Sequence, residues 1–350
     1  MLNEALQLPE SLLPFINGNQ LAIDCGISSS KIVFSVQLEN HEQVFRSLGL
    51  LNEELKTVLL EIQETFGQKV FEKIFVVGFK NLWATTVVKS VFDVDANVVE
   101  EISALSNGVQ LVSDNFQLSE IEIKNEESLS LYDKYKIDLK NPMFQKVIQA
   151  MQISTPNETK SGEGIIHFPS IIVLGGSALK FYLLNSDGSA KLIAYSMFAG
   201  ETLKGLFKCL VDSNNFKENI LLASIGDREK IDTQVYEVLS ENLNSPYGQF
   251  PPDLPIFSFG KCADYNKGKE DVNPNDLLES LSFLFLIETN NQVNTLCKAF
   301  KTKYVYFCGD IFNYQLFSKI LQLGEILLPR LIETKILNVN YILALGTLKK

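Results

Sequence analysis

Residues 20–36 of the chain read QLAIDCGISSSKIVFSV, the pattern of a β-hairpin whose tip is made of small residues. An apolar run ends in Asp24 and Gly26, a turn of three serines follows at 28–30, and a second β-rich run covers 31–36. Small residues at a tip let backbone N–H groups approach an anion, and nearby hydroxyl groups add donors. We expect Asp24 to face the same space, where its carboxylate could hold a magnesium ion or a water. Because many such hairpins bind nothing, the rest of the chain has to decide between phosphate binding and an ordinary turn.

Composition limits the classes of protein to which the chain can belong. Its 350 residues are 46% hydrophobic and 21% charged, enough for a large core in two domains or one bilobed unit. The net charge is −11 and no sustained basic run occurs, so neither a nucleic acid nor an anionic membrane surface is expected as a partner. No apolar run reaches membrane-spanning length, and the N-terminus lacks the pattern of a signal peptide.

Cysteine and histidine usage narrows the chemistry further. The five cysteines are odd in number and form no Cys-x-x-Cys pair, which is typical of reduced thiols and predicts a cytoplasmic protein. The two histidines are His41 and His167, both expected in loops or at strand ends. A histidine-based metal site or a Ser-His triad is therefore disfavoured.

A second hairpin of the same kind opens the second half of the chain. Residues 170–184 read SIIVLGGSALKFYLL, which predicts a strand, a tip at Gly175, Gly176 and Ser177, and a returning strand. Two facing hairpins with glycine tips suit a cleft that holds a polyphosphate from both sides. We therefore expect a lead-in at 1–19, an N-terminal lobe at 20–165 and a C-terminal lobe at 166–350.

Hydrophobic periodicity predicts the remaining elements. Strands are expected at 73–78, 191–196 and 304–310, and a short apolar element at 341–348. Residues 122–166 are polar and predict a long excursion between the lobes. Helices are expected at 52–66, 81–92, 96–107, 200–212, 216–224, 231–243, 275–300 and 313–324.

The order of these pieces resembles the eukaryotic (type II) pantothenate kinases of the actin-like ATPase superfamily, from about residue 20 to the C-terminus. Besides the two hairpins, the matching segments are Glu100–Leu105, Leu222–Asp227, Ser258–Lys261, Thr289–Asn291, Cys308–Asp310 and Leu343–Leu348. The resemblance implies an α/β, bilobed actin-like ATPase (ribonuclease H-like) fold, with two mixed-sheet lobes around a nucleotide cleft.

The resemblance also implies a reaction and a set of site residues. ATP and Mg²⁺ would bind between the lobes, and pantothenate would be phosphorylated to 4′-phosphopantothenate, the first committed intermediate of coenzyme A biosynthesis. Glu101 takes the place of the family's catalytic base, Lys191 that of an arginine that stabilises charge, and Asp24 would hold Mg²⁺ indirectly. The implied phosphate and nucleotide contacts are Gly26, Ser28, Ser29 and Lys31 in the first hairpin, Gly175, Gly176 and Ser177 in the second, and Gly309 in the late turn near adenosine.

Four residues depart from the family pattern close to this chemistry. Ile27, Phe79 and Phe198 add bulk and Glu201 adds a carboxylate where the family presents bare backbone to phosphate. Since each preorganised donor is worth roughly 3 kcal/mol, we expect weakened ATP binding and weak or lost turnover. Three hypotheses remain: a working pantothenate kinase, a pseudokinase that regulates an active homologue, and a related kinase with another acceptor.

The family resemblance finally implies a dimer. Family members associate through their long helix, which corresponds to residues 275–300 here and would serve a homodimer or a heterodimer with a homologous kinase. A long core helix within a monomer explains the same apolar pattern. Acyl-CoA is a further ligand that the resemblance suggests.

Overall fold

The computed structural model describes most of the chain. The described residues are 5–8, 12, 14, 16, 18–38, 43–115, 166–211, 213–239, 255–263, 272–314, 316–317, 321, 332–337 and 341–349. Most of the predicted excursion at 122–166, the end of the predicted helix at 231–243 and most of the predicted helix at 313–324 lie outside them.

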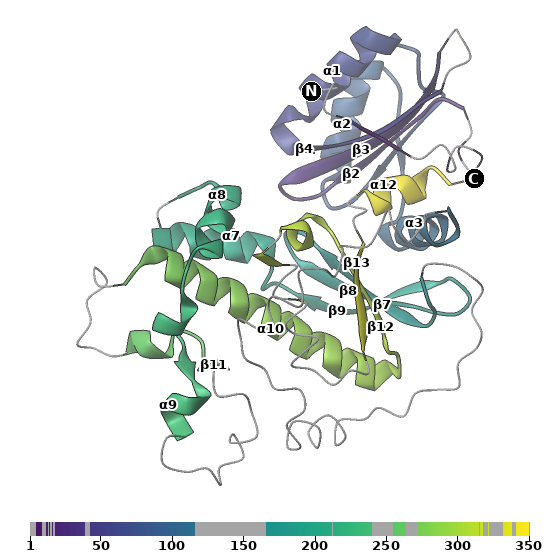
Figure 1. Ribbon diagram of the computed structural model, residues 1–350. Coiled ribbons are helices and arrows are strands. Elements are labelled where there is room, and N and C mark those ends of the chain that lie inside the picture. The colour runs from purple at the N-terminus through teal and green to yellow at the C-terminus, as the bar shows by residue number, and fades with distance from the viewer. Residues whose placement is uncertain are drawn as a thin grey trace.

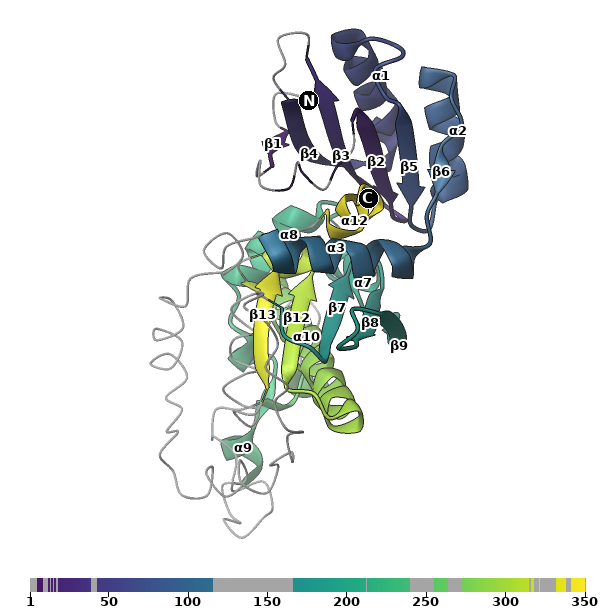
Figure 2. The same ribbon diagram turned by 90° about the vertical axis from the view of Figure 1, so that its right-hand side faces the viewer.

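The first lobe, at the top of Figure 1, is built on a six-stranded mixed sheet in the order β1-β4-β3-β2-β5-β6, whose strands are all labelled in Figure 2. Its strands are β1 (Leu6–Gln7), β2 (Gln20–Cys25), β3 (Ser29–Gln37), β4 (Gln43–Leu51), β5 (Lys73–Val77) and β6 (Asn97–Val98). Helices α1 (Leu55–Phe66) and α2 (Asn81–Phe92) cover one face. Successive side chains of a strand point to opposite faces, so Leu21 and Ile23 pack with these helices, whereas Ala22 and Asp24 point to the other face.

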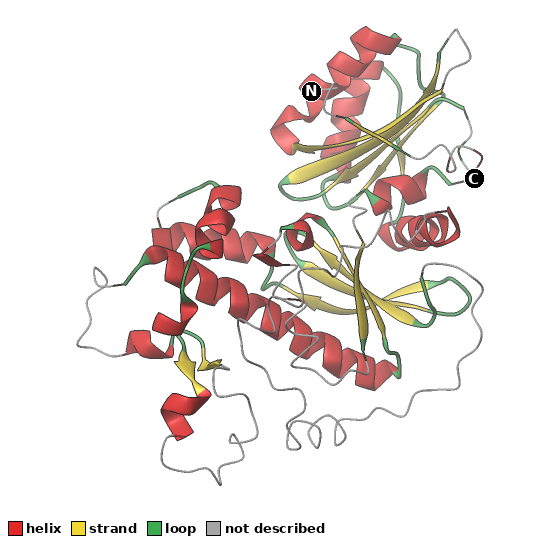
Figure 3. Ribbon diagram, viewed as in Figure 1, coloured by secondary structure: helices red, strands yellow, loops and turns green. Residues whose placement is uncertain are grey.

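The second lobe is built on a five-stranded mixed sheet in the order β13-β12-β7-β8-β9. Its strands are β7 (Ser170–Gly175), β8 (Leu179–Leu184), β9 (Ala190–Ser196), β12 (Tyr304–Cys308) and β13 (Glu333–Leu337). Strand β12 pairs in parallel with β7 and β13, whereas β7, β8 and β9 form an antiparallel meander. Helices α7 (Gly200–Val211), α8 (Phe216–Ser224) and α10 (Pro274–Phe300) cover one face (Figure 3).

Two helices lie between the sheets and join the lobes (Figure 2). They are α3 (Glu101–Asn115) and the short C-terminal α12 (Ile342–Thr347), and one apolar cluster includes both helices and residues of both sheets. Two glycines allow their close approach: a Cβ at Gly108 would lie 2.1 Å from the Ile342 carbonyl oxygen, and a Cβ at Gly346 only 1.8 Å from that of Ala104. Although α12 follows the second lobe in the chain, it packs against α3 and strands of the first sheet.

The expected fold class is confirmed: the chain is α/β, and hairpins 20–36 and 170–184 belong to different mixed sheets. Strands β4 and β13 were not predicted from the sequence, and α3 begins at Glu101 rather than at residue 96. The predicted helix at 231–243 is wrong at its start, because β10 (Thr233–Gln234) pairs with β11 (Pro255–Phe257) and α9 (Val235–Leu239) begins only afterwards. Among the described helices, none has both the length and the apolarity needed to cross a membrane.

Candidate active site between the lobes

The tips of the two hairpins meet between the lobes. Ser28 Oγ at the first tip lies 3.4 Å from Ser177 Oγ at the second. Each tip is closed by its own backbone: Gly26 N–H donates to the Ser29 carbonyl at 3.0 Å, and Gly176 N–H donates to the Ala178 carbonyl at 3.1 Å. The facing arrangement expected for a polyphosphate cleft is therefore present.

Strands β2 and β3 place Asp24 and Lys31 side by side behind the first tip. The two residues are direct partners in the antiparallel register. Burial raises the pKa of Asp24 to about 6, an effect that Lys31 opposes and that Glu101 reinforces. Burial alone would lower the pKa of Lys31, but the carboxylates of Asp310 and Asp24 outweigh it and raise that pKa. These side chains therefore form one electrostatic group that draws charges from both lobes.

Glu101, the first residue of α3, is held by two side chains of the second lobe. Lys180 Nζ lies 2.6 Å from each carboxylate oxygen, and the Tyr182 hydroxyl donates to Oε1 at 2.6 Å. Lys180 and Tyr182 are two residues apart on β8 and therefore point to the same face of the sheet. Burial and the hydrogen bond to Glu101 raise the pKa of Tyr182, so its hydroxyl stays protonated as a donor.

Glycines let the turn after β12 approach the end of β7. Gly309 has φ +117°, and a Cβ there would lie 1.9 Å from the Gly175 carbonyl oxygen. A Cβ at Gly175 would lie 2.3 Å from the Phe312 ring. Gly176, by contrast, has no atom within 4 Å of its Cβ position, so a side of its backbone is open to an approaching group. The second hairpin thus combines a tightly packed base with an accessible tip.

The N-terminus of α7 is engaged with the second tip. Gly200 N–H donates to the Gly176 carbonyl at 3.0 Å, and Glu201 N–H donates to the Ser177 carbonyl at 3.3 Å. The first N–H groups of a helix have no partner within the helix and commonly bind anions. Here two of them stabilise the hairpin.

Comparison with known proteins now identifies the family. The model of the family described as Fumble matches residues 20–319, which include both hairpins and α3. The chain belongs to the Fumble family. This confirms the resemblance to type II pantothenate kinases. Pantothenate kinase 1 of Arabidopsis thaliana is 29% identical over 144 residues, a match that spans 41% of this chain and only 37% of that protein.

Two solved structures are similar to the whole Fumble-family chain. The ethanolamine utilization protein EutJ from Carboxydothermus hydrogenoformans has a TM-score of 0.46 at 10% identity, covering 99% of this chain and 93% of that chain. Glucokinase from Balamuthia mandrillaris in complex with glucose has a TM-score of 0.43 at 11% identity, covering 95% of this chain and 92% of that chain.

The Fumble-family fold brings most of the predicted site residues together. Those that meet at the lobe junction are Asp24, Gly26, Ser28, Ser29, Lys31, Glu101, Gly175, Gly176, Ser177 and Gly309. Lys191 is not among them: it is exposed and pairs with Leu183, at the end of β9 away from the tip. It is five positions from Ser196, about 16 Å along a strand.

Sequence reasoning missed four residues of the site. Lys180 and Tyr182 lie in the second hairpin, and their spacing of two residues was a signal that both side chains point to the same face of the strand. Asp310 was recognised only as part of a turn, yet it forms an ion pair with Lys31. The fourth, Asn52, gave no signal, because it follows a strand that was not predicted.

The departures from the Fumble-family pattern differ in their effect. The expectation that Phe198 fills the phosphate space is wrong: its ring packs edge-on against Phe285, at 5.6 Å between centroids, within the apolar layer of the second lobe. Ile27 is 41% exposed, and it is not among the described residues with positive φ, so its backbone needs no glycine. Phe79 is 76% exposed.

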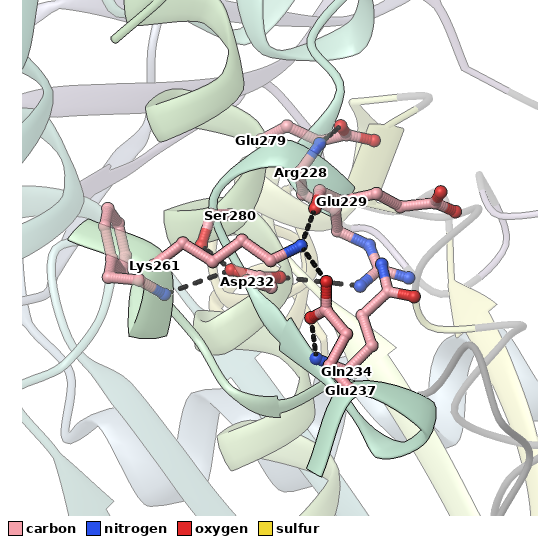
Figure 4. A network of polar contacts seen from close by, with 9 residues as sticks. Arg228, Glu229, Asp232, Gln234, Glu237, Lys261, Glu279 and Ser280 are labelled. Atoms are coloured by element: carbon pink, nitrogen blue, oxygen red, sulfur yellow. Dashed lines mark hydrogen bonds and ion pairs between the residues drawn. The ribbon is translucent and has the colours of Figure 1, made fainter. Parts of the chain in front are cut away.

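A buried polar network around Asp232 joins the matching segment Ser258–Lys261 to the long helix α10 (Figure 4). Asp232 accepts from the Phe259 N–H at 3.1 Å, from the Ser280 hydroxyl, and from Arg228 Nη1 at 3.5 Å. The Arg228 backbone N–H donates to Glu279 on α10 at 2.7 Å. Because Arg228 and Asp232 are almost fully buried, these contacts hold the segment against α10 and are structural in character.

Proposed function

We propose that this Fumble-family chain is a phosphotransferase that binds Mg-ATP between its lobes and phosphorylates the primary hydroxyl of pantothenate. The observation that supports the proposal best is the convergence of Asp24, Lys31 and Glu101 at the point where the two tips meet. These residues come from different elements, and folding alone does not require carboxylates and an ammonium at a junction of glycine turns. Phosphoryl transfer needs such positioned charges more than it needs covalent chemistry.

The residues present suit a magnesium ion that is bound mainly through the nucleotide. Asp24 is a partly buried carboxylate on the face directed at the second lobe. Within the described ranges, no group of three or more His, Cys, Asp or Glu side chains could hold a metal by itself. Mg²⁺ commonly keeps its waters and binds through one or two carboxylates plus phosphates. When bound, it would neutralise charge on the phosphate oxygens.

Glu101 is the base in this proposal. A carboxylate has about four acceptor positions, and Lys180 and Tyr182 use three of them. The remaining position is available to the acceptor hydroxyl, from which Glu101 takes the proton. Lys180 and Tyr182 fix the direction of the carboxylate, a role that the exposed Lys191 cannot share from its place on β9. Lys31 supplies positive charge beside the first tip.

A pseudokinase is the second candidate, and specific contacts favour it. Lys31 is paired with Asp310, Lys180 is paired with Glu101, and the first N–H groups of α7 donate to the second hairpin. In each case a group suited to a phosphate or a substrate has a partner within the chain. Such a protein would keep the fold and regulate an active homologue.

An assay of ADP release with pantothenate as acceptor separates the two candidates. Turnover that disappears in Glu101→Gln supports the kinase. Binding of Mg-ATP with no ADP release above the level of Glu101→Gln supports the pseudokinase. If other alcohols are phosphorylated and pantothenate is not, the chain is a kinase with another acceptor.

A dimer and a cytoplasmic location remain predictions. The N-terminal half of α10 is buried on nearly all sides within the chain. Its exposed positions further along are the polar Glu288, Asn291, Thr295 and Lys298 and, at the end of the helix, Ala299 and Phe300. A dimer through α10, whether with a second copy or with a homologue, would therefore use mainly polar contacts, and light scattering measures it. Cys25, Cys297 and Cys308 are buried and form no disulfide, which suits a reducing compartment.

A further inference from the structure

Asn52 binds three successive residues of the first tip, although it is 26 residues from Gly26 in sequence. It follows β4, at the start of the single helical turn Asn52–Glu54, and it is 8% exposed. Its side-chain amide Nδ2 donates to the carbonyls of Gly26 at 3.1 Å and Ile27 at 2.8 Å, and its backbone N–H donates to that of Ser28 at 3.3 Å. Three successive carbonyls are thus held by one residue.

Hydrogen bonding fixes the orientation of this amide. A backbone carbonyl can only accept, so the nitrogen of the Asn52 side chain must face Gly26 and Ile27. The opposite atom, Oδ1, accepts from the Ser30 hydroxyl at 2.7 Å. Because both sides of the amide have complementary partners, a flipped amide would lose these bonds. Asn52 therefore imposes one geometry on the tip.

That geometry determines where the tip N–H groups point. In a trans peptide group, the carbonyl of one residue and the N–H of the next point in opposite directions. Because Asn52 binds the carbonyls of Gly26 and Ile27, the N–H groups of Ile27 and Ser28 point away from it. No group in the described part of the chain accepts from either N–H. Two adjacent free N–H groups make an anion-binding nest, and the Ser28 hydroxyl places this one opposite Ser177.

We infer that Asn52 is a positioning residue that preorganises the Ile27 and Ser28 N–H groups for a phosphate of the bound nucleotide. The inference rests on the proposed function, because it takes Mg-ATP as the ligand of the cleft. Removing the amide would let the tip carbonyls turn outward and present acceptors, rather than donors, to the phosphate. Affinity for the phosphate groups then falls even when the fold is retained.

The test measures Mg-ATP binding by calorimetry, together with hydrogen exchange of the tip amides. Asn52→Asp keeps the size but replaces the donor by an acceptor, and Asn52→Ala removes both. We expect at least about tenfold weaker binding in each, and loss of the protection that Mg-ATP gives to the Ile27 and Ser28 amides. Ser30→Ala removes the hydroxyl that contacts Asn52 Oδ1 and Cys25 Sγ and so loosens the orientation of the Asn52 amide. It should weaken binding about threefold, and it decides the question if the Asn52 variants do not fold.

Asn97→Ala is the matched control, because Asn97 also donates to a backbone carbonyl of the first lobe, that of Ile74, but lies on the edge strand. It should bind Mg-ATP within about twofold of the unmodified protein. Unchanged binding in folded Asn52→Asp, or in Ser30→Ala where the Asn52 variants do not fold, overturns the inference and leaves the proposed function standing. If the unmodified protein binds neither Mg-ATP nor magnesium pyrophosphate at millimolar concentration, both are overturned.

Discussion

Lys31 of the first lobe and Asp310 of the second form an ion pair, with 3.0 Å between Nζ and Oδ2. The lysine side chain is 17% exposed and the aspartate side chain 48%, so the pair lies at the mouth of the junction rather than in its core. Asp310 follows Gly309, in the turn that the family resemblance places near adenosine. The Asp310 carboxylate thus pairs with the Lys31 ammonium group, which the proposed function assigns to a phosphate.

Asp310→Asn should therefore strengthen nucleotide binding. The substitution keeps the shape of the turn and frees Lys31, and a half-exposed pair is worth about 1 kcal/mol, or about fivefold in affinity for Mg-ATP. Calorimetry measures the change. Asp227→Asn is the matched control, since its carboxylate is 49% exposed and pairs with Lys230 at 3.2 Å in another part of the lobe. Weaker binding of Mg-ATP in Asp310→Asn would mean that Asp310 contributes to nucleotide binding.

Glu101→Gln should lower pantothenate phosphorylation at least about a hundredfold, because the amide cannot take a proton. Glu100→Gln is the control: Glu100 is the exposed neighbour just before α3 and should keep full turnover. ADP release under saturating substrate measures both. Equal activity of the two variants would exclude Glu101 as the base.

Asp24 should make the free energy of unfolding depend on pH. Its pKa of about 6 in the folded chain exceeds the ordinary value of 3.8, so the folded state holds the proton more tightly and stability falls as pH rises between these values. The loss is at most about 3 kcal/mol and is complete by about pH 7. Asp24→Asn should remove this contribution and, relative to the unmodified protein, gain stability between about pH 4 and pH 7.

Denaturant unfolding at several pH values tests the Asp24 prediction. Asp95→Asn provides the control, since the Asp95 carboxylate is 90% exposed. If the free energies of unfolding of Asp24→Asn and of the unmodified protein change in parallel with pH, burial does not raise the pKa of Asp24.

Gly309→Ala should destabilise the chain strongly. The positive φ costs about 1 kcal/mol for alanine, and the clash with the Gly175 carbonyl adds about 2 kcal/mol or more. Gly188→Ala isolates the first effect, because Gly188 also has positive φ, at +79°, but no atom lies within 4 Å of its Cβ position. Thermal unfolding measures the stability of both variants. An equal loss of stability in the two would mean that the turn after β12 moves freely away from β7.

Local patterns in the sequence predicted the two hairpins because apolar runs and small-residue tips are properties of neighbouring residues. The partners of Glu101 were not predictable in this way: Lys180 is 79 residues away and meets it only after two sheets and α3 have packed. Strand β13 is short, and only Leu337 in it is buried, so it has no clear apolar alternation. Its place is set by pairing with β12.

The assignment of Lys191 shows how an implied role depends on register. Gly175, Gly176 and Ser177 mark the second tip, and the structure brings them to the junction. Lys191 lies at the first residue of the predicted strand 191–196, three residues after Gly188 and away from the second tip, and the pairing of β8 with β9 shifts between Phe181 and Tyr182. The role implied by the family resemblance did not take this position into account.

The packing of α12 has a consequence for how the chain acquires its structure during synthesis. The apolar face of the first sheet that contains Ala22 and Val33 is completed by Ile342, Leu345 and their neighbours, which are synthesised after the strands of both sheets. Until those residues emerge, the part of this apolar face that α12 covers stays exposed. A nascent chain stalled before residue 342 should thus be a substrate for chaperones and proteases, however complete its second sheet is.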